Sequence, residues 1–469
     1  MESLKNLRLK LTPWIDGMYT FKYCDVELTL ENADLEVGDK VADLWVAVAG
    51  VPGCELDERG LVAVDGKGAI SLQQTVKKDK MIGFDKRVWR AERATEGDIV
   101  VSYRFLPRDV SDINRCYPIF DAIQEKNGAL ICGVTTIAAV EMANYHIYVS
   151  WDKSHMPEDA GVAAIRGVGD FDFVGTPMDY TFSLYMVGKI KSVVDVSGKR
   201  RVYWLDDHLP DEEKAITQLP PLLEVMCSFF KDKDLNYGIF FRKEPFEISN
   251  SGTAFEGGFA YGYSDKMPLV METALSTLAH EIVHNWCRLE HATGEENWYS
   301  EGTAEFYSIL VPLRSGIISE EQAAEWITDR CPNYYNNEYQ NLTNLEAYEK
   351  AWEASEIQRV PYGRGFVYLT YIDYLLKQKG KESLDHLVLE IEDRRRSGKP
   401  YGTAVWEELI EKELGAEAVV EFREIMDGKK MIEPDDRWFD GKFTFQRGAY
   451  GDVKRGTVEN ALIWSRRGQ

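Results

Sequence analysis

The segment His-Glu-Ile-Val-His at residues 280–284 is the part of the sequence that most directly suggests chemistry. Side chains four residues apart lie on the same face of an α-helix, about one turn apart. The imidazole rings of His280 and His284 are therefore expected to reach one metal ion together. Glu281 projects from an adjacent part of the same helix, where its carboxylate can act on a water molecule without being a ligand. The pattern is typical of zinc hydrolases.

A motif this short also arises by chance, and the alternative is a helix that carries two histidines on its polar face. The distribution of histidine argues against that alternative, because three of the seven histidines of the chain fall within residues 280–291. The opposite side of the segment is apolar, so the helix can bury one face and present the other. Its apolar side chains are Leu275, Leu278, Ile282 and Trp286.

A hydrolytic zinc site keeps three protein ligands and leaves a fourth position for water. A third histidine in the metzincin arrangement would require glycine at position 287 and histidine at position 290, but the chain has Cys287 and Glu290 there. Cys287 itself is more typical of a buried thiol than of a nucleophile. The remaining candidate is a glutamate on a following helix, and Glu301 supplies it. We therefore expect one Zn²⁺ per chain, bound by His280, His284 and Glu301.

The residues around Glu301 suggest how the third ligand is held. Ser300 is expected to cap its helix, which places Glu301 in the first turn. Glu305 follows one turn later and is a candidate acceptor for a histidine N–H behind the metal. A solvated helix carboxylate is an equally good interpretation of Glu305.

Amide hydrolysis also needs a hydrogen-bond donor toward the oxyanion of the transition state. Tyr362 and Arg364, just before a predicted helix, are candidates for this role. A Gly-containing strand predicted at 255–263 offers Gly257 and Gly258, which would let a peptide backbone approach closely and pair with the strand edge. The alternative for these two glycines is a bulge or a turn.

The composition excludes several other classes of protein. The chain has 469 residues, of which 44% are hydrophobic and 28% charged, as in an ordinary folded protein. Its formal net charge of −23 repels phosphate backbones and anionic lipids, so neither nucleic acid nor a membrane is an expected partner. No apolar run reaches the roughly 18 residues that span a bilayer. The seven cysteines include no CxxC pair, which favours reduced thiols and a cytoplasmic protein.

The elements that must position these residues fall into two main regions. Alternating apolar and polar residues predict an antiparallel, β-sandwich-like domain at 1–205. A mainly helical catalytic domain with a small sheet is expected at 206–430, with a helical C-terminal part at 365–430. A C-terminal extension is expected at 431–469. The fold class is thus α+β. The expected helices are 272–287, which carries the zinc motif, 301–314, which carries the third ligand, 319–330, 365–377, 384–397 and 404–414.

Taken together, these segments resemble the gluzincin metallopeptidases, and within that clan the glycyl aminopeptidase family. Residues 280–286 match the family's zinc helix, including the Trp after the second His. Residues 298–302 match its Trp-x-x-Glu-Gly segment, and residues 313–321 resemble the segment that follows. Tyr-Gly-Arg-Gly at 362–365 matches a Tyr-x-Lys-Gly segment, with Arg in place of Lys. The resemblance covers residues 230–430 well and the N-terminal region more loosely.

The resemblance implies a thermolysin-like catalytic domain behind an N-terminal β domain. It implies that His280, His284 and Glu301 bind zinc. Glu281 would be the general base and Tyr362 the oxyanion donor. Many bacterial members append a PDZ domain, and we expect none here.

One departure from the family bears on the substrate. Members carry Gly-Gly-x-Glu-His where this chain has Gly-Gly-Phe-Ala-Tyr at 257–261. In the related aminopeptidases a glutamate at this place binds the free amine of the substrate, and Ala260 cannot do so. Glu256 and Asp265 are candidates to substitute for it.

These observations predict a zinc metallopeptidase that hydrolyses peptide bonds, most simply an aminopeptidase related to the glycyl aminopeptidases. Because of Ala260, the alternative within the same class is an endopeptidase or oligopeptidase. A hypothesis of another class is a peptide-binding protein that retains a structural zinc site. Glu281 and Tyr362 argue against it, since a binding protein needs neither group. The sequence does not indicate an oligomeric state.

Overall fold

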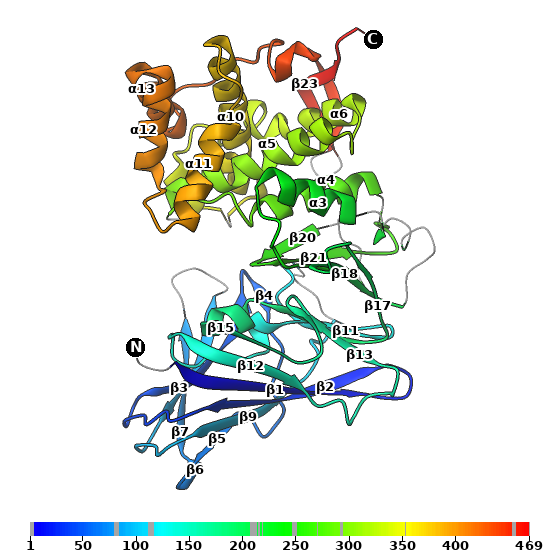
Figure 1. Cartoon of the computed structure of the whole chain (residues 1–469), viewed down its shortest axis with the longest axis vertical. Helices are drawn as coiled ribbons and strands as arrows, with labels where there is room; N and C mark the ends of the chain where they lie inside the picture. The colour runs from blue at the N-terminus through cyan, green and yellow to red at the C-terminus, as the bar shows by residue number, and fades with distance from the viewer. Residues whose placement is uncertain are drawn as a thin grey trace. The chain divides into compact units, whose positions relative to one another are not determined.

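The computed structural model describes residues 4–78, 84–110, 117–206, 213, 216–217, 219–245, 251–269, 271–290, 294–351, 353–452 and 456–468. Cys116 and His291 lie outside these residues. The chain folds as two compact units, Met1–Pro220 with Asp234–Ala274, and Pro221–Lys233 with Leu275–Gln469. The first unit is built mainly of strands and the second mainly of helices (Figure 1).

The largest sheet of the first unit has seven strands. Its order is β15 (Phe171–Gly175), β12 (Tyr145–Trp151), β1 (Lys5–Ile15), β2 (Phe21–Leu30), β9 (Ile99–Phe105), β5 (Val62–Asp65) and β6 (Gly68–Ile70). Along β1, buried Leu7 and Leu9 alternate with exposed Arg8 and Lys10, the period-two pattern of a strand with one face on the core. The pairing of β1 with β12 is parallel, an exception to the antiparallel arrangement that the sequence predicts for this domain.

Two smaller sheets complete the N-terminal region. One has four strands in the order β4 (Val51–Pro52), β3 (Lys40–Val48), β8 (Asp85–Ala91) and β7 (Leu72–Lys78). The other has five, β10 (Ala122–Glu125), β11 (Gly128–Cys132), β16 (Leu184–Gly188), β13 (Gly161–Ala164) and β14 (Gly167–Val168), and the short helix α1 (Pro177–Thr181) precedes β16. Side chains of all three sheets share one apolar core, so the expected β domain is present.

A mixed sheet of five strands also belongs to the first unit. Its order is β17 (Ile190–Val194), β18 (Arg200–Leu205), β19 (Tyr237–Lys243), β21 (Gly258–Tyr263) and β20 (Ser251–Phe255). The central strands β18, β19 and β21 run parallel, and each outer strand is antiparallel to its neighbour. The sequence places β19, β20 and β21 after residue 205, in the catalytic domain, whereas in the structure the whole sheet groups with the β region.

The second unit consists of helices and one hairpin. The helices are α3 (Pro220–Phe229), α4 (Met271–Val283), α5 (Asn297–Ser315), α6 (Glu320–Arg330), α7 (Pro332–Tyr335), α8 (Asn344–Glu349), α9 (Ser355–Gln358), α10 (Val360–Gln378), α11 (Asp385–Arg396), α12 (Thr403–Leu414) and α13 (Ala416–Met426). The hairpin of β22 (Phe443–Asp452) and β23 (Gly456–Arg466) packs on α6 and α7. Trp464 in β23 donates from Nε1 to Cys331 Sγ at 3.2 Å, so the C-terminal extension is part of this unit.

The expected helices agree with the structure to within a few residues at most ends. Three ends differ further. Helix α10 begins at Val360 rather than at residue 365, so Tyr362 and Arg364 lie within it rather than before it. Helix α4 ends at Val283, because its last turn tightens and the amide of Trp286 bonds to the carbonyl of Val283, three residues back. Helix α5 begins at Asn297 rather than at Glu301, so Ser300 lies inside the helix and does not cap it.

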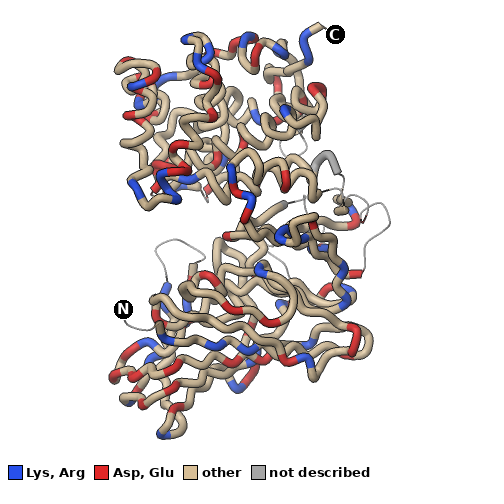
Figure 2. Tube along the Cα trace, viewed as in Figure 1, with Lys and Arg blue, Asp and Glu red and all other residues tan. Residues whose placement is uncertain are grey.

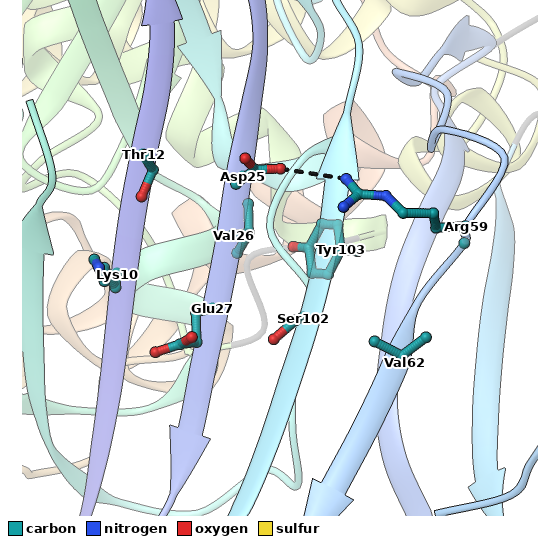
Figure 3. A pocket seen from close by; sticks show the side chains of 10 residues that line it. Lys10, Thr12, Asp25, Val26, Glu27, Arg59, Val62, Ser102 and Tyr103 are labelled. Carbon is teal, nitrogen blue, oxygen red and sulfur yellow. Dashed lines mark hydrogen bonds and ion pairs between the residues drawn. The ribbon is translucent and has the colours of Figure 1, made fainter. Parts of the chain in front are cut away.

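The outer face of the seven-stranded sheet is hollowed over β1, β2, β9 and β5 (Figure 3). The hollow has a volume of about 350 Å³ and is lined by side chains of both charges. Arg59 reaches across it to Asp25, at 3.5 Å. Acidic and basic residues are also interleaved along the part of the chain that the structure describes (Figure 2).

Two further observations bear on the class of protein. Among the described residues, no helix is both long enough and apolar enough to cross a membrane. The six described cysteines are all buried free thiols: Cys24, Cys54, Cys132, Cys227, Cys287 and Cys331.

Candidate metal centre

Three side chains of the second unit converge on one point. The Nε2 atoms of His280 and His284 are 3.2 Å apart, and Oε2 of Glu301 lies 3.3 Å and 3.5 Å from them. Zinc binds such atoms at about 2.0–2.2 Å in a tetrahedron, whose ligand atoms are then about 3.3 Å apart. Within the described residues, no other group of three His, Cys, Asp or Glu side chains is close enough to share an ion.

The electrostatics of the site also fit a cation. Oε2 of Glu301 is buried and has no hydrogen-bond partner. Burial alone would raise the pKa of Glu301, but His284 and His280 hold it below its ordinary value, so the carboxylate is ionised and ready to bind a metal. Burial opposes a charge on His280, yet Glu305 and Glu301 raise the pKa of this histidine to about 10. The surrounding carboxylates thus favour positive charge at this point, which zinc would supply.

The outward nitrogen of each histidine also has a partner. Nδ1 of His284 lies 3.1 Å from Oγ of Ser300, and Nδ1 of His280 lies 3.7 Å from Oε1 of Glu305. When Nε2 of each ring faces a metal, Nδ1 carries the proton and donates it to such an acceptor, which fixes the orientation of the ring. Glu305 therefore lies beside a histidine, as the first of its two interpretations expects. Ser300 is not the helix cap that the sequence suggested, and its position next to Glu301 was the only signal of its contact with His284.

Glu281 and Tyr362 lie beside the three converging side chains. Burial raises the pKa of the Glu281 carboxyl, and the neighbouring His280 and His284 partly oppose this rise. The ring of Tyr362 is parallel to the imidazole of His280, with an angle of 2° and 5.7 Å between the ring centroids. Burial and the nearby Glu301 raise the pKa of Tyr362 well above its ordinary value, so its hydroxyl keeps a proton to donate. The structure thus brings five of the expected residues together.

A close crossing of α5 and α10 sets the positions of Glu301 and Tyr362. The two helices approach at Gly302 and Gly365, where a Cβ on Gly302 would lie 2.5 Å from the Cα of Gly365. A Cβ on Gly365 would lie 2.1 Å from the carbonyl oxygen of Trp298. Only glycine at both positions allows this approach, which explains the glycine after Glu301 and the second glycine of the 362–365 segment.

Gly302→Ala is expected to lower the free energy of unfolding by about 1–3 kcal/mol, because the added methyl group forces two backbones apart. It should also lower zinc affinity, since Glu301 is the preceding residue. Urea unfolding of the zinc-free protein and a zinc titration measure the two effects. Gly451→Ala is the matched control, because a Cβ there meets nothing within 4 Å. Equal stabilities of the two variants would contradict the role of the crossing.

Arg364 is not placed as the sequence suggested. It is 1% exposed, and its guanidinium donates to the side chain of Asn344 and to the carbonyl oxygens of Gln340, Leu342 and Met426. Its donors are therefore occupied by a structural role, tying α10 to the loop before α8 and to the end of α13. The expected contact of Arg364 with substrate or oxyanion is not supported.

The two glycines of the first unit also have local roles. Gly257 has a φ of +71° in the turn between β20 and β21, a conformation that favours glycine. Gly258 packs on Ile165, whose Cδ1 would lie 2.5 Å from an added Cβ. Because β21 pairs with β19 on one side and β20 on the other, it has no free edge for a peptide. The turn, the second interpretation of these glycines, is the one that the structure shows.

The carboxylates near Ala260 differ from the expected pair. Glu256 is exposed in the turn, and Asp265 is exposed and forms an ion pair with Lys243 at 2.8 Å. Ala260 itself is buried in an apolar cluster. On the same face of β21, Oε1 of Glu244 would lie 2.9 Å from a Cβ on Gly262, a neighbour that sequence reasoning missed. Glu244 is buried and accepts from Nε of Arg242 at 2.6 Å, so its charge is already paired.

No protein-family model matches the sequence, and no curated protein is detectably similar to it. Solved structures are similar in fold. An aminopeptidase N family protein from Idiomarina loihiensis aligns with a TM-score of 0.71 and 16% identity, over 95% of this chain and 80% of that one. An M1 zinc metallopeptidase from Deinococcus radiodurans, bound to a Tyr-Ser-Ala substrate, aligns with a TM-score of 0.54 and 15% identity, over 92% and 95%. Yeast LTA4 hydrolase aligns with a TM-score of 0.54 and 11% identity, over 93% and 69%.

These likenesses show the fold. The chain has the architecture of the M1 zinc metallopeptidases, with an N-terminal β region followed by a helical region, and the predicted α+β class is confirmed. None of these three neighbours is named a glycyl aminopeptidase, so the finer resemblance stays a prediction.

Proposed function

We propose that this chain is a zinc-dependent peptidase that hydrolyses peptide bonds, and that it acts as an aminopeptidase. The observation that carries the proposal is the convergence of His280, His284 and Glu301 beside Glu281 and Tyr362. Two histidines and a carboxylate form a zinc donor set with one position left open. The last two residues are a base and a hydrogen-bond donor that metal binding alone does not require.

When bound, zinc supplies a Lewis acid that polarises the scissile carbonyl and lowers the pKa of water. Glu281 takes the proton of the attacking water and later passes it to the leaving amine. Its raised pKa suits both steps, because a carboxyl that is too acidic would not return the proton. Tyr362 donates from its hydroxyl to the oxyanion that forms on the carbonyl oxygen. Ser300 and Glu305 keep the two imidazoles in orientation.

The aminopeptidase assignment is supported by the named structural neighbours, of which one is an aminopeptidase N family protein. Endopeptidase or oligopeptidase action is the second candidate, and Ala260 is the observation that favours it. A buried methyl group at this place cannot form an ion pair with a substrate amine. For the compartment, the buried free thiols support the cytoplasm.

The test is a mixture of peptides, half with free N-termini and half acetylated, incubated with the protein and analysed by mass spectrometry. We expect stepwise loss of residues from the free N-termini only, abolished by a chelator and restored by Zn²⁺. Internal cuts in both halves would replace the aminopeptidase with an endopeptidase. Absence of any metal-dependent cut would favour a peptide-binding protein with a structural metal.

A further inference from the structure

A buried arginine lies behind the metal centre and joins three helices. Arg330 is the last residue of α6 and is 7% exposed. Its Nη2 donates to Oγ of Ser276 in α4 at 3.1 Å and to Oγ of Ser308 in α5 at 3.0 Å. Its Nη1 donates to the carbonyl oxygen of Trp326 in its own helix at 3.1 Å. One guanidinium thus connects the zinc helix, the third-ligand helix and α6.

The same guanidinium forms an ion pair with Glu305. Nε of Arg330 lies 2.5 Å from Oε2 of Glu305, while Oε1 of Glu305 faces Nδ1 of His280. Glu305 therefore stands between Arg330 and a metal ligand, with one oxygen toward each. Ser276 lies one turn before His280 on α4, and Ser308 lies one turn after Glu305 on α5. Arg330 therefore contacts Glu305 directly. It also contacts α5, which carries Glu305, and α4, which carries His280.

Arg330 also affects the charge balance of the site. Glu281, Glu301 and Glu305 bring three carboxylates into one buried site, and one divalent cation balances only two of them. Arg330 balances the third. With Oε2 held by the guanidinium, Glu305 cannot turn toward the ion and replace a ligand. Its Oε1 faces Nδ1 of His280 at 3.7 Å, on the side of the ring opposite the Nε2 that lies near Glu301 and His284.

We propose that Arg330 is a positioning residue of the metal centre: it holds Glu305 in place behind His280 and thereby sets the affinity for zinc. The inference rests on the proposed zinc site and adds to it a residue on a helix that carries no ligand. The competing explanation is a purely structural role through Ser276, Ser308 and Trp326. That role would lower the stability of the fold but leave the zinc affinity of the folded protein unchanged.

The test compares Arg330→Gln, Arg330→Lys, Glu305→Gln and the double variant Arg330→Gln/Glu305→Gln. The zinc dissociation constant of each is measured by competition with a chromophoric chelator, at a temperature where circular dichroism shows the zinc-free protein to be folded. The Tm of each zinc-free variant is measured separately. Arg364→Gln is the control, because Arg364 is also a buried arginine but bonds to none of the ligands.

We expect Arg330→Gln to weaken zinc binding about 10–100-fold, the usual effect of losing a partner behind a ligand. Glu305→Gln should do the same, and the double variant should lose no more than about threefold beyond either, because Arg330 acts through Glu305. Arg330→Lys keeps the charge and should recover most of the affinity. Arg364→Gln should lower the Tm and leave the zinc affinity unchanged.

The outcomes separate this inference from the proposed function. If the wild-type protein binds zinc and Arg330→Gln binds it equally well with a lower Tm, the positioning role is wrong and the zinc site stands. Fully additive losses in the double variant would also overturn it. If Arg330→Gln does not fold, Arg330→Lys and Glu305→Gln are compared instead. A loss of zinc affinity in Arg330→Lys as large as that in Glu305→Gln would show that the charge of residue 330 does not hold Glu305, and would overturn the positioning role. A wild-type protein that binds no zinc would overturn both proposals.

Discussion

Replacing Glu281 by glutamine should lower kcat by about 10²–10⁴-fold, the usual contribution of general acid–base catalysis, while zinc stays bound. The amide has nearly the same size and shape as the carboxyl, so the packing of α4 is kept. It cannot take the proton of the attacking water, nor deliver one to the leaving amine. The two measurements are kcat on the peptide substrate found in the cleavage assay and zinc content by atomic emission.

The loss of activity in Glu281→Gln must be separated from a general effect of removing a negative charge. Glu325 is an exposed glutamate on α6, and Glu325→Gln removes one charge from the same unit without touching the site. We expect that control to keep wild-type kcat. Retention of most activity in Glu281→Gln would refute the mechanism, and loss of zinc from it would mean that Glu281 supports the ligands rather than the proton transfer.

The side chains that converge at the candidate metal centre can be picked out from the sequence because the information is local. The four-residue spacing of His280 and His284 and the helical periodicity around Glu301 each depend on one helix. The predicted helices, for instance 404–414 against the observed Thr403–Leu414, agree for the same reason. The fold class also follows from the change of pattern along the chain.

What the sequence could not predict depends on partners far along the chain. Arg330 and Arg364 are both single arginines in helical segments, and nothing near them indicates that one faces Glu305 while the other binds backbone carbonyls. The parallel pairing of β1 with β12 joins strands more than a hundred residues apart. Gly257 and Gly258 fit both a free edge and a turn until the neighbours of β21 are known. Ser300 was misassigned because α5 begins one turn earlier than expected.

Tyr362→Phe should lower kcat by about 10²–10³-fold with little change in KM, because removal of one oxyanion donor typically costs that much. The parallel packing of the ring on His280 does not involve the hydroxyl, so phenylalanine should keep it. Zinc should therefore remain bound, and the variant loses only the donor. Steady-state kinetics measure kcat and KM, and a zinc assay of the same sample measures the bound metal.

The split between kcat and KM is what identifies the role of Tyr362. A hydrogen bond made only in the transition state lowers kcat and kcat/KM together, whereas a contact made equally to the bound substrate raises KM alone. Tyr371 lies on the same helix, and its hydroxyl donates a hydrogen bond to Glu421. Tyr371→Phe therefore removes a hydroxyl from α10 away from the site, and it should leave kcat unchanged. A rise in KM at constant kcat in Tyr362→Phe would make the residue a substrate contact. The oxyanion would then need another donor, and Arg364 cannot provide it, because its guanidinium is buried against backbone carbonyls.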